Sequence, residues 1–533
     1  MKTIVEGRGL GFAYADSGRW IFRDATFDVA EGEMLVVAGP SGGGKSTLLR
    51  CMNGLVPHFH GGRFEGRVMA GGIDTRWAQP RDLAHVAGMV FQDPEAQTVA
   101  STVEEEIAFG LENLGKQATV TRRRLEEALD ALSIAHLRSR RLSTLSGGEL
   151  QRVAIAAVLT MQPKVLLLDE PTSQLDPQAA ADVLNFVAQL RSELGLTVVI
   201  AEHRLDRLAA YADRIMLVPG DGTVRAGGVR ETLEALPGGP AVAAIGRALG
   251  WAPLPLSVGE ARRFVNGTAL SAEGVCNRRH GSAAGDVAVS VRGVTVTLDG
   301  HDALRGVTVD LHAGEIVALM GRNGAGKTTL LRTIAGLASP RRGEVGYARG
   351  EHPARDRYRT LALVAQDPAS VLYHTMVERE IADVLHGTGR PGTVEEALDE
   401  WGLRDLRGAN PADLSSGERQ RVALAAMLAG DPAVVLLDEP TRGMDHATKE
   451  LLLRNLRRRR DEGAAIVLAS HDVELAAECA SRVVLLAEGE VIADGPAADV
   501  LSESMTFTTQ ANKLLGGRVL TVDDALHAMG ARA

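Results

Sequence analysis

Two short glycine-rich segments constrain the fold of this chain more than any other feature of its sequence. GPSGGGKST (Gly39 to Thr47) follows the apolar run Met34 to Ala38, and GRNGAGKTT (Gly321 to Thr329) follows a second run, Ile316 to Met320. A buried strand, a glycine loop and a helix start, in that order, predict a phosphate cradle. Backbone N–H groups of the loop and helix start point at the anion, and the glycines let the backbone approach closely. The duplication argues against an ordinary glycine turn that caps a helix.

Each loop carries a lysine followed by two hydroxyl residues. Lys45 is predicted to neutralise the β- and γ-phosphates of a nucleotide, and the Ser46 hydroxyl to hold Mg²⁺. Lys327 and Thr328 stand at the same places in the second loop. The residues predicted to contact the phosphates are Gly39, Pro40, Ser41, Gly42, Gly43, Gly44, Lys45, Ser46 and Thr47 in the first loop, and Gly321, Arg322, Asn323, Gly324, Ala325, Gly326, Lys327, Thr328 and Thr329 in the second.

An internal repeat extends far beyond the two glycine loops and keeps the same order in both halves. The paired segments are FQDPEAQTVASTVEEEIAFG with AQDPASVLYHTMVEREIADV, LSGGELQRVAIAAVL with LSSGERQRVALAAML, VLLLDEPTSQLD with VVLLDEPTRGMD, and TVVIAEH with AIVLASH. Each half alternates short apolar runs with amphipathic stretches, which is typical of a mostly parallel sheet with helices on its faces. The repeat therefore predicts two α/β domains of the same fold.

The length of 533 residues also favours two domains, because it is long for one hydrophobic core. We expect P-loop nucleoside triphosphatase domains over residues 1–222 and 287–499. A small extension and a flexible, Gly/Ala/Pro-rich linker are expected over 223–286, and a C-terminal extension over 500–533.

Composition argues against several classes of protein. The net charge of −10 gives no general attraction to nucleic acid, and three scattered cysteines form no metal spacing. The basic clusters Arg122 to Arg124, Arg138 to Arg141 and Arg457 to Arg460 are expected on solvated helix faces beside acidic residues. There is no hydrophobic signal core, and no apolar run approaches the roughly 18 to 20 residues of a membrane helix. We therefore expect a cytosolic chain, unless a partner recruits it to a membrane.

Two acidic pairs follow buried strands. Asp169 and Glu170 end the apolar run Val165 to Leu168, and Asp438 and Glu439 repeat the pair. At the carboxyl edge of a parallel sheet they would lie beside the glycine loop. Asp169 and Asp438 are predicted to complete a Mg²⁺ sphere, and Glu170 and Glu439 to polarise the attacking water.

Two glutamines and two histidines also follow apolar runs. Gln92 and Gln366 are predicted to reach the metal and the water, and His203 and His471 to contact the γ-phosphate. A lone residue of either type in such a place is more often a satisfied polar group near the core. The prediction rests on their occurrence twice in the same order as the phosphate loops.

The serine and glycine segments LSGGE and LSSGE begin two further amphipathic helices. Ser146, Gly147 and Gly148, and likewise Ser415, Ser416 and Gly417, would form a second exposed helix N-terminus able to bind phosphate. The simpler interpretation is a helix N-cap, because Ser146 precedes Glu149 by three residues, the spacing of a capping box.

Together, these segments resemble the ATP-binding cassette (ABC) ATPases over nearly all of both halves. The resemblance implies a pseudo-dimeric, head-to-tail arrangement with two composite ATP and Mg²⁺ sites, in which the signature segment of one half closes over the nucleotide of the other. The first loop would face Ser415, Ser416 and Gly417, and the second Ser146, Gly147 and Gly148. Both sites keep their glutamate and histidine, so both are expected to hydrolyse ATP.

The two sites are expected to differ. Ser416 replaces a signature glycine, which makes the turn over the first loop bulkier. Tyr14 matches the adenine-stacking aromatic of the family, whereas Val296 stands at the equivalent place in the second half. Since stacking on an aromatic is worth roughly 1–3 kcal/mol in nucleic-acid complexes, the second loop is predicted to hold ATP more weakly and with less base preference.

Several segments are similar to the ATPases of energy-coupling-factor (ECF) importers of vitamins and transition-metal ions. They are Phe91 to Gly115, Ala201 to Leu208, Glu439 to Asp445 and Ser504 to Leu526. This similarity implies an integral membrane scaffold subunit, which docks at residues 93–110 and 367–384, and a separate membrane protein that captures the substrate. The chain would lie peripherally at the cytoplasmic face of the membrane, with no substrate site and no nucleic acid partner.

Other assignments stay open at this stage. The chain is also compatible with the ATPase of a different importer type, or with a tandem ABC ATPase that acts on ribosomes. Ribosomal ATPases of this kind resemble chains with a long charged helical insertion, whereas residues 223–286 are rich in Gly, Ala and Pro. DNA-repair relatives carry zinc cysteine clusters, which this chain lacks.

Overall fold

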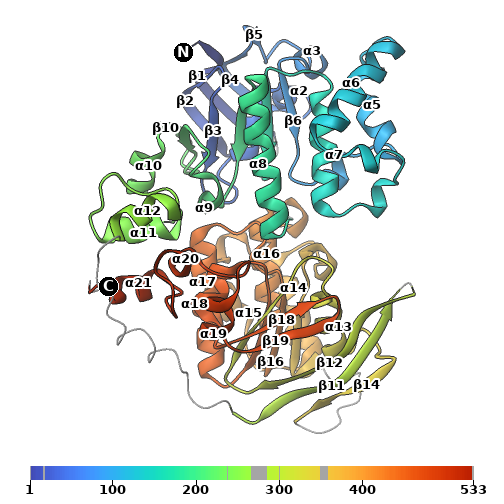
Figure 1. Cartoon of the computed structure of the whole chain (residues 1–533), viewed down its shortest axis with the longest axis vertical. Coiled ribbons are helices and arrows are strands. Elements are labelled where there is room, and N and C mark those ends of the chain that lie inside the picture. Colours follow the sequence, from blue (N-terminus) through green and yellow to red (C-terminus); the bar gives the residue numbers. More distant parts are fainter. Residues whose placement is uncertain are drawn as a thin grey trace. The chain divides into compact units, whose positions relative to one another are not determined.

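The computed structural model describes residues 2–15, 18–173, 175–236, 238–265, 285–298, 300–348 and 358–530. These form two compact units, Met1–Gly239 and Pro240–Ala533 (Figure 1). The boundary falls inside 223–286, the segment predicted as an extension and linker. Its part from 266 to 284 lies outside the described residues.

The first unit contains an antiparallel and a mostly parallel sheet. The antiparallel sheet has the order β2 (Trp20–Ala30), β1 (Thr3–Tyr14), β4 (Gly62–Ala70) and β5 (Ile73–Asp74). The second sheet has the order β10 (Arg225–Gly228), β9 (Arg214–Leu217), β3 (Met34–Ala38), β8 (Thr197–Ala201), β7 (Val165–Asp169) and β6 (Ala87–Val90). Every residue of β3, β7 and β8 is buried, as expected for central strands covered on both faces.

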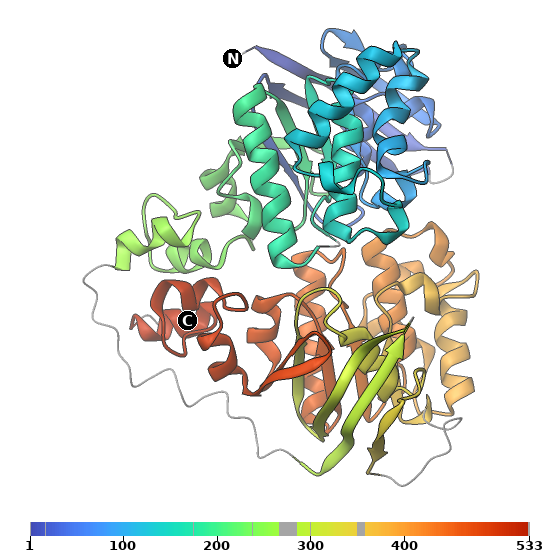
Figure 2. The same ribbon diagram turned by 45° about the vertical axis from the view of Figure 1, so that its right-hand side comes forward.

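Helices connect these strands. They are α1 (Lys45–Met52), α2 (Leu55–His58), α3 (Pro80–Leu83), α4 (Pro94–Gln97), α5 (Val103–Asn113), α6 (Ala118–Ala131), α7 (Gly147–Leu159), α8 (Pro177–Leu194), α9 (Leu205–Leu208) and α10 (Val229–Ala235), with 3₁₀ turns at Ala135–Leu137 and Leu142–Thr144. Figure 2 shows α5, α6 and α7, in cyan, standing together as a helical subdomain.

The second unit repeats this plan. Its antiparallel sheet has the order β12 (His301–His312), β11 (Val287–Leu298) and β14 (Arg342–Tyr347). Its main sheet has the order β15 (Leu361–Val364), β16 (Val434–Asp438), β17 (Ala465–Ala469), β13 (Ile316–Met320), β18 (Arg482–Ala487) and β19 (Glu490–Pro496). The helices are α13 (Lys327–Ile334), α14 (Val377–Thr388), α15 (Val394–Glu400), α16 (Ser416–Leu428), α17 (His446–Asp461), α18 (Val473–Cys479) and α19 (Ala497–Glu503), with 3₁₀ turns at Pro368–Val371, Arg404–Leu406 and Pro411–Asp413.

Four short helices from distant parts of the chain form a small module in the second unit. They are α11 (Ala241–Ala248), α12 (Val258–Val265), α20 (Gln510–Leu515) and α21 (Val522–Ala528). Buried apolar side chains, among them Val242, Ile245, Leu514 and Ala525, form its core. The Gln510 side chain also accepts a hydrogen bond from the Val242 N–H (3.3 Å).

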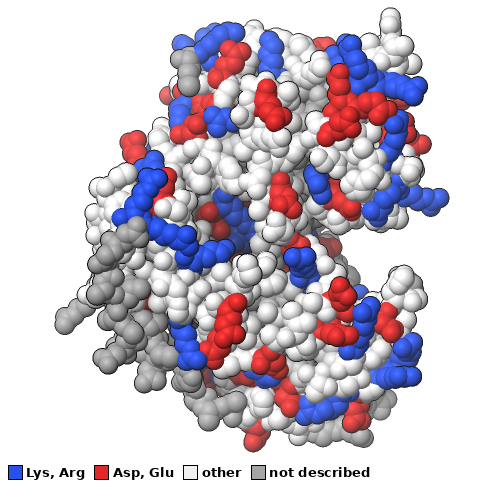
Figure 3. All heavy atoms as spheres, viewed as in Figure 1, with Lys and Arg blue, Asp and Glu red and all other residues white. Residues whose placement is uncertain are grey.

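The basic clusters take acidic partners. Figure 3 shows acidic and basic side chains mixed over the visible face of each unit. Arg138 binds Glu104 and Glu126, each at 2.7 Å. The expectation of a solvated face is wrong for one member of the cluster from 457 to 460. Arg459 is only 1% exposed, because its guanidinium turns inward to the carboxylate of Glu400. Among the described helices, none is long and apolar enough to cross a membrane.

Candidate functional site

Each phosphate loop leaves a fully buried strand and turns sharply into a helix. Gly44 has φ of 105° and Gly326 has φ of 104°, a left-handed conformation that glycine adopts without the penalty of a side chain. A Cβ on Gly39 would lie 2.1 Å from the carbonyl oxygen of Val218 in the neighbouring strand connection. These glycines are therefore required by the backbone path, as the strand–loop–helix pattern predicted.

The loop lysines are folded back over their own loops. Lys45 Nζ, in a residue that is 4% exposed, donates to the carbonyls of Gly39 (3.1 Å) and Pro40 (2.9 Å). Lys327 Nζ makes the same two bonds, to Gly321 (2.8 Å) and Arg322 (3.2 Å). Each amine thus lies at the centre of its cradle, where it can neutralise a phosphate.

The predicted metal ligands lie together in both units. Ser46 Oγ donates to Asp169 (2.9 Å), and Thr328 Oγ1 donates to Asp438 (2.7 Å). Burial and the neighbouring charge of Glu170 raise the pKa of Asp169 to about 6, and burial raises the pKa of Asp438. The second carboxylate oxygen of Asp438, Oδ1, is buried without a hydrogen-bond partner. A hard oxygen-binding cation such as Mg²⁺ fits this set of hydroxyl and carboxylate oxygens.

Glu170 stands at the end of β7 in a strained conformation. Its φ is 46°, and that of Glu439 is 47°, which for non-glycine residues costs about 1–3 kcal/mol. Glu170 accepts a hydrogen bond from Gln92 Nε2 (2.8 Å) and lies 2.7 Å from His203 Nε2. His203 also reaches Lys45 Nζ, at 3.1 Å. The four predicted residues therefore form one connected group that can orient a water molecule beside the loop.

The second unit brings together the equivalent residues. Glu439 lies 2.8 Å from His471 Nδ1. A cavity of about 350 Å³ is bordered by Gln366, Asp438, Glu439 and the loop from Asn323 to Thr329. Ser415, Ser416 and Gly417 do not border this cavity. They lie at the start of α16, as Ser146, Gly147 and Gly148 lie at the start of α7, so their use across two halves stays a prediction.

Both signature serines cap their helices. Ser146 forms a reciprocal capping box with Glu149, and Ser415 forms one with Glu418. The simpler interpretation of these segments, a helix N-cap, is therefore confirmed. A capping box does not compete with phosphate binding, because it leaves other N–H groups of the first turn free. Ser416 lies close to Gly443, where a side chain would crowd it, because a Cβ on Gly443 would be only 2.9 Å from the Ser416 hydroxyl.

Tyr14 ends β1 beside the first loop. Its hydroxyl lies 2.8 Å from Thr47 Oγ1, and its ring packs edge-on against Phe12. Val296, by contrast, is buried in the core of the second unit. The structure thus leaves the second loop without an aromatic ring at this position.

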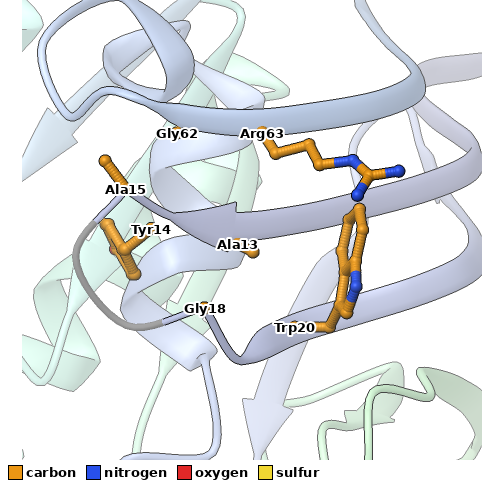
Figure 4. Close-up of a pocket in the computed structure, with 7 residues that line it drawn as sticks. All are labelled: Ala13, Tyr14, Ala15, Gly18, Trp20, Gly62 and Arg63. Carbon is orange, nitrogen blue, oxygen red and sulfur yellow. The ribbon is translucent and has the colours of Figure 1, made fainter.

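A cavity of about 490 Å³ borders Tyr14 on the outer side of the hairpin (Figure 4). Its wall is formed by Trp20 and Arg63. The guanidinium of Arg63 lies over the Trp20 ring, 4.8 Å from the ring centroid. Both residues pair with Ala13 in the sheet register and so share the face opposite Phe12 and Tyr14. The Trp20–Arg63 pair therefore covers the outside of the sheet and does not belong to the phosphate side.

Sequence reasoning missed two supporting glutamates. Glu106 accepts hydrogen bonds from the N–H groups of Val99 and Ala100, both at 2.9 Å, and Glu380 accepts one from His374 at 2.6 Å. Both are buried. Their recurrence in EEEIAFG and EREIADV was the available signal, although charged residues on a helix otherwise indicate a solvated face.

Comparisons with known proteins agree with this geometry. The family model described as ABC transporter matches residues 22–173 and 304–442. The chain is an ABC ATPase. Family members bind ATP, generally with Mg²⁺, and ABC ATP-binding subunits normally work with membrane components.

This ABC ATPase is similar to proteins from bacteria and archaea. It is 46% identical to a putative ABC transporter ATP-binding protein of Streptomyces coelicolor, over 95% of this chain and 96% of the relative. It is 34% identical to one of Methanosarcina mazei, over 93% and 90%. The archaeal ribosome recycling factor aABCE1, solved with the ribosomal stalk protein aP1, aligns with a TM-score of 0.61 and 21% identity over 93% of this chain and 91% of that chain. This likeness shows that both share the tandem ABC fold.

Proposed function

We propose that this ABC ATPase energises a membrane importer of the ECF type, for a vitamin or a transition-metal ion. The observation that carries this proposal is a backbone connection, present in both units, between the segment after the site glutamine and the segment before the signature serine. The resemblance of residues 91–115, 201–208, 439–445 and 504–526 to ECF ATPases supports the importer type.

In the first unit, this connection is a short ladder. The N–H of Glu104 donates to Arg138 (3.1 Å), that of Val103 to Arg140 (3.2 Å), and that of Leu142 to Ser101 (3.1 Å). Leu142 lies four residues before Ser146. A displacement of the loop around residue 100 is therefore passed directly to the signature segment.

The second unit repeats the ladder. Val377 N–H donates to Ala409 and Glu378 N–H to Arg407, both at 3.1 Å. The Arg407 side chain binds Glu378 (2.6 Å), as Arg138 binds Glu104. Because these hydrogen bonds occur in both units, they suit an importer in which both nucleotide sites move membrane helices.

The surface beside the ladder suits a membrane partner. Val99 is 62% exposed, Phe109 43% and Leu114 37%, and Tyr373 at the position of Val99 in the repeat is 80% exposed. Exposed apolar side chains in and beside α5, and at the equivalent place of the second unit, suit a protein interaction surface. The membrane scaffold docks here, at residues 93–110 and 367–384, and a separate membrane protein captures the substrate. The chain then lies at the cytoplasmic face of the membrane.

ATP occupies the two loops, with Lys45 and Lys327 on the phosphates and Glu170 and Glu439 orienting the water. Mg²⁺ would be held by Ser46, Gln92 and Asp169 in the first unit and by Thr328, Gln366 and Asp438 in the second, and it would neutralise phosphate charge. The signature residues of each half close over the nucleotide of the other. ATP thus favours the closed state and hydrolysis releases it, so differential nucleotide affinity moves the docked helices.

The test is co-purification from native membranes in mild detergent. We expect a tagged chain to recover a polytopic scaffold and one or more small membrane proteins, together with ATP hydrolysis. The variants Val99→Asp and Tyr373→Asp should lose these partners. Trp77→Asp is the matched control, because Trp77 is also 72% exposed but lies outside the docking surface.

Other recoveries would change the assignment. Two large transmembrane subunits with an external binding protein would indicate a different importer type. Recovery with ribosomes, and none with membranes, would overturn the transport proposal and leave the ATPase assignment intact.

A further inference from the structure

The backbone amides of the two site histidines have different partners. The N–H of His203 donates to the carboxylate of the preceding residue, Glu202 (3.0 Å). The N–H of His471 donates to Glu439 itself (3.4 Å), through the same oxygen that contacts the His471 ring. One oxygen of Glu439 therefore contacts both the N–H and the ring of His471. In the first unit the His203 N–H is bound by Glu202, and Glu170 contacts only the His203 ring.

Glu202 is a buried acid that the hydrolytic chemistry does not itself require. It is 2% exposed at the end of β8, and its carboxylate also accepts a hydrogen bond from Thr172 Oγ1. Burial and the charge of Glu170 raise its pKa, while Thr172, His203 and Arg207 oppose the rise. A buried carboxyl among such partners is costly to place, so its contacts must offset the cost.

The second unit carries a different set at the same positions. Ser470, fully buried, replaces Glu202, and the apolar Leu475 replaces Arg207. Thr441 occupies the place of Thr172. The chain thus allows a comparison between a histidine that follows a buried glutamate and one that follows a buried serine, with the buried Asp472 on its other side.

The two water-orienting glutamates also differ in their contacts. In the first unit, the two carboxylate oxygens of Glu170 contact different side chains, Oε2 with Gln92 and Oε1 with His203. The ring nitrogen involved is Nε2 for His203 and Nδ1 for His471, so the two rings present different edges to their glutamates.

We propose that Glu202 is a positioning residue of the first ATP site, which holds the His203 backbone and Thr172 so that Glu170 stays in contact with Gln92 and the His203 ring. It acts through these neighbours and does not touch the nucleotide. This role makes hydrolysis at the first loop faster than at the second, and it rests on the assignment of Glu170 and His203 to the hydrolytic step.

The experiment isolates the first site in the full chain by the background change Glu439→Gln. Single-turnover hydrolysis and binding of a fluorescent ATP analogue are measured for Glu202→Ser, which installs the residue of the second unit, and for Glu202→Gln. We expect Glu202→Ser to lower the rate constant about tenfold, the equivalent of about 1.4 kcal/mol, with ATP affinity changed less than about twofold. Glu202→Gln keeps an accepting oxygen and should recover at least half of the lost rate.

Two further variants make every outcome decisive. Thr172→Val removes the donor to Glu202 without touching the acid, and should reproduce a smaller loss of rate at the same ATP affinity. Glu170→Gln should abolish first-site turnover; if it does not, the assignment of the site fails. An unchanged rate in Glu202→Ser, or a loss confined to ATP affinity, overturns the positioning role alone.

Discussion

Tyr14 and Val296 occupy the same place in the repeat but offer a nucleotide base very different surfaces. Tyr14 is anchored by its hydroxyl to Thr47, so its ring is held relative to the first phosphate loop. Val296 is 2% exposed and points into the core. We therefore predict that the base preference of the two sites depends on Tyr14, whose ring is held by the bond to Thr47 and by edge-on contacts with Phe12 and His60.

The change Tyr14→Val should weaken ATP binding at the first loop about tenfold, because stacking on an aromatic is worth roughly 1–3 kcal/mol. The preference for ATP over GTP should fall with it. Both are measured by titration in a Lys327→Ala background. Tyr14→Phe keeps the ring and removes the hydroxyl, so it separates stacking from the bond to Thr47. Equal losses in both variants would show that the bond, and not the ring, matters.

The roles of individual residues could be predicted from the sequence where the residues belong to a recognisable motif. Lys45, Ser46, Asp169 and Glu170 lie together because the glycine loop and β7 end at the same sheet edge. Glu106 could not be assigned in this way, since its partners are backbone N–H groups, and Glu202 could not be assigned because one of its two partners is the His203 N–H. Backbone positions carry no signature in the sequence.

At the scale of elements, α15 and α17 are joined by a buried ion pair that their counterparts α6 and α8 lack. Arg459 binds Glu400 and the carbonyl of Leu428. The equivalent residues in the first unit are Ala131 and the buried Leu190. The second unit therefore has an ion pair at positions where the first unit has an exposed alanine and a buried leucine.

Breaking this pair from one side should be costly, and replacing both members should not. Arg459→Leu or Glu400→Ala alone should cost about 2–3 kcal/mol, less than the about 3–5 kcal/mol of a fully buried pair because Glu400 keeps 21% side-chain exposure. The double variant restores the arrangement of the first unit and should recover most of the loss. Hydrogen exchange of the α15 and α17 amides reports the change locally. Additive losses in the double variant would contradict the coupling.

The pair should also make the second unit sensitive to acid. Burial acts to raise the pKa of Glu400, but the hydrogen bonds of Arg459 and Arg458 outweigh it and leave the pKa below its ordinary value of 4.5. The stabilisation is complete above that ordinary value and is lost as the pH falls through the lowered pKa of the folded state. The protection factors of the α17 amides, which correct for the intrinsic pH dependence of exchange, should therefore fall below pH 4.5 in the native chain. The double variant should show a shallower dependence, and an identical one would reject the explanation.

At the scale of the whole chain, the duplication was predictable and the helical module was not. Two α/β units with the same sheet order follow from the repeated segments. The packing of α11 and α12 against α20 and α21 joins segments about 250 positions apart. The likeness of LSVGEA (256–261) to LTVDDA (520–525) relates the two segments but does not say that they pack together. The amphipathic pattern of these four helices indicates that each packs its apolar face on another element. It does not indicate which element that is.

Disturbing the end of this module should loosen its beginning. Ala525, fully buried in the module core, is the test position, and Ala525→Asp would bury an unpaired charge. We expect hydrogen exchange to accelerate in α11 and α12 as well as in α21. Asp523→Ala, at an exposed position of the same helix, is the control and should leave the protection of α11 unchanged. Loss of protection confined to α21 would contradict the shared core.

Glu400 and Arg459 in the second unit stand at the positions of Ala131 and Leu190 in the first. This difference limits how the two halves can exchange sequence. A genetic crossover between the aligned repeats that joined the first-unit α6 to the second-unit α17 would bury Arg459 without Glu400, the carboxylate that contacts it through both oxygens. Such recombinants would be unstable before any nucleotide site was affected. Gene conversion between the halves is therefore expected to preserve this part of the helical region as one block.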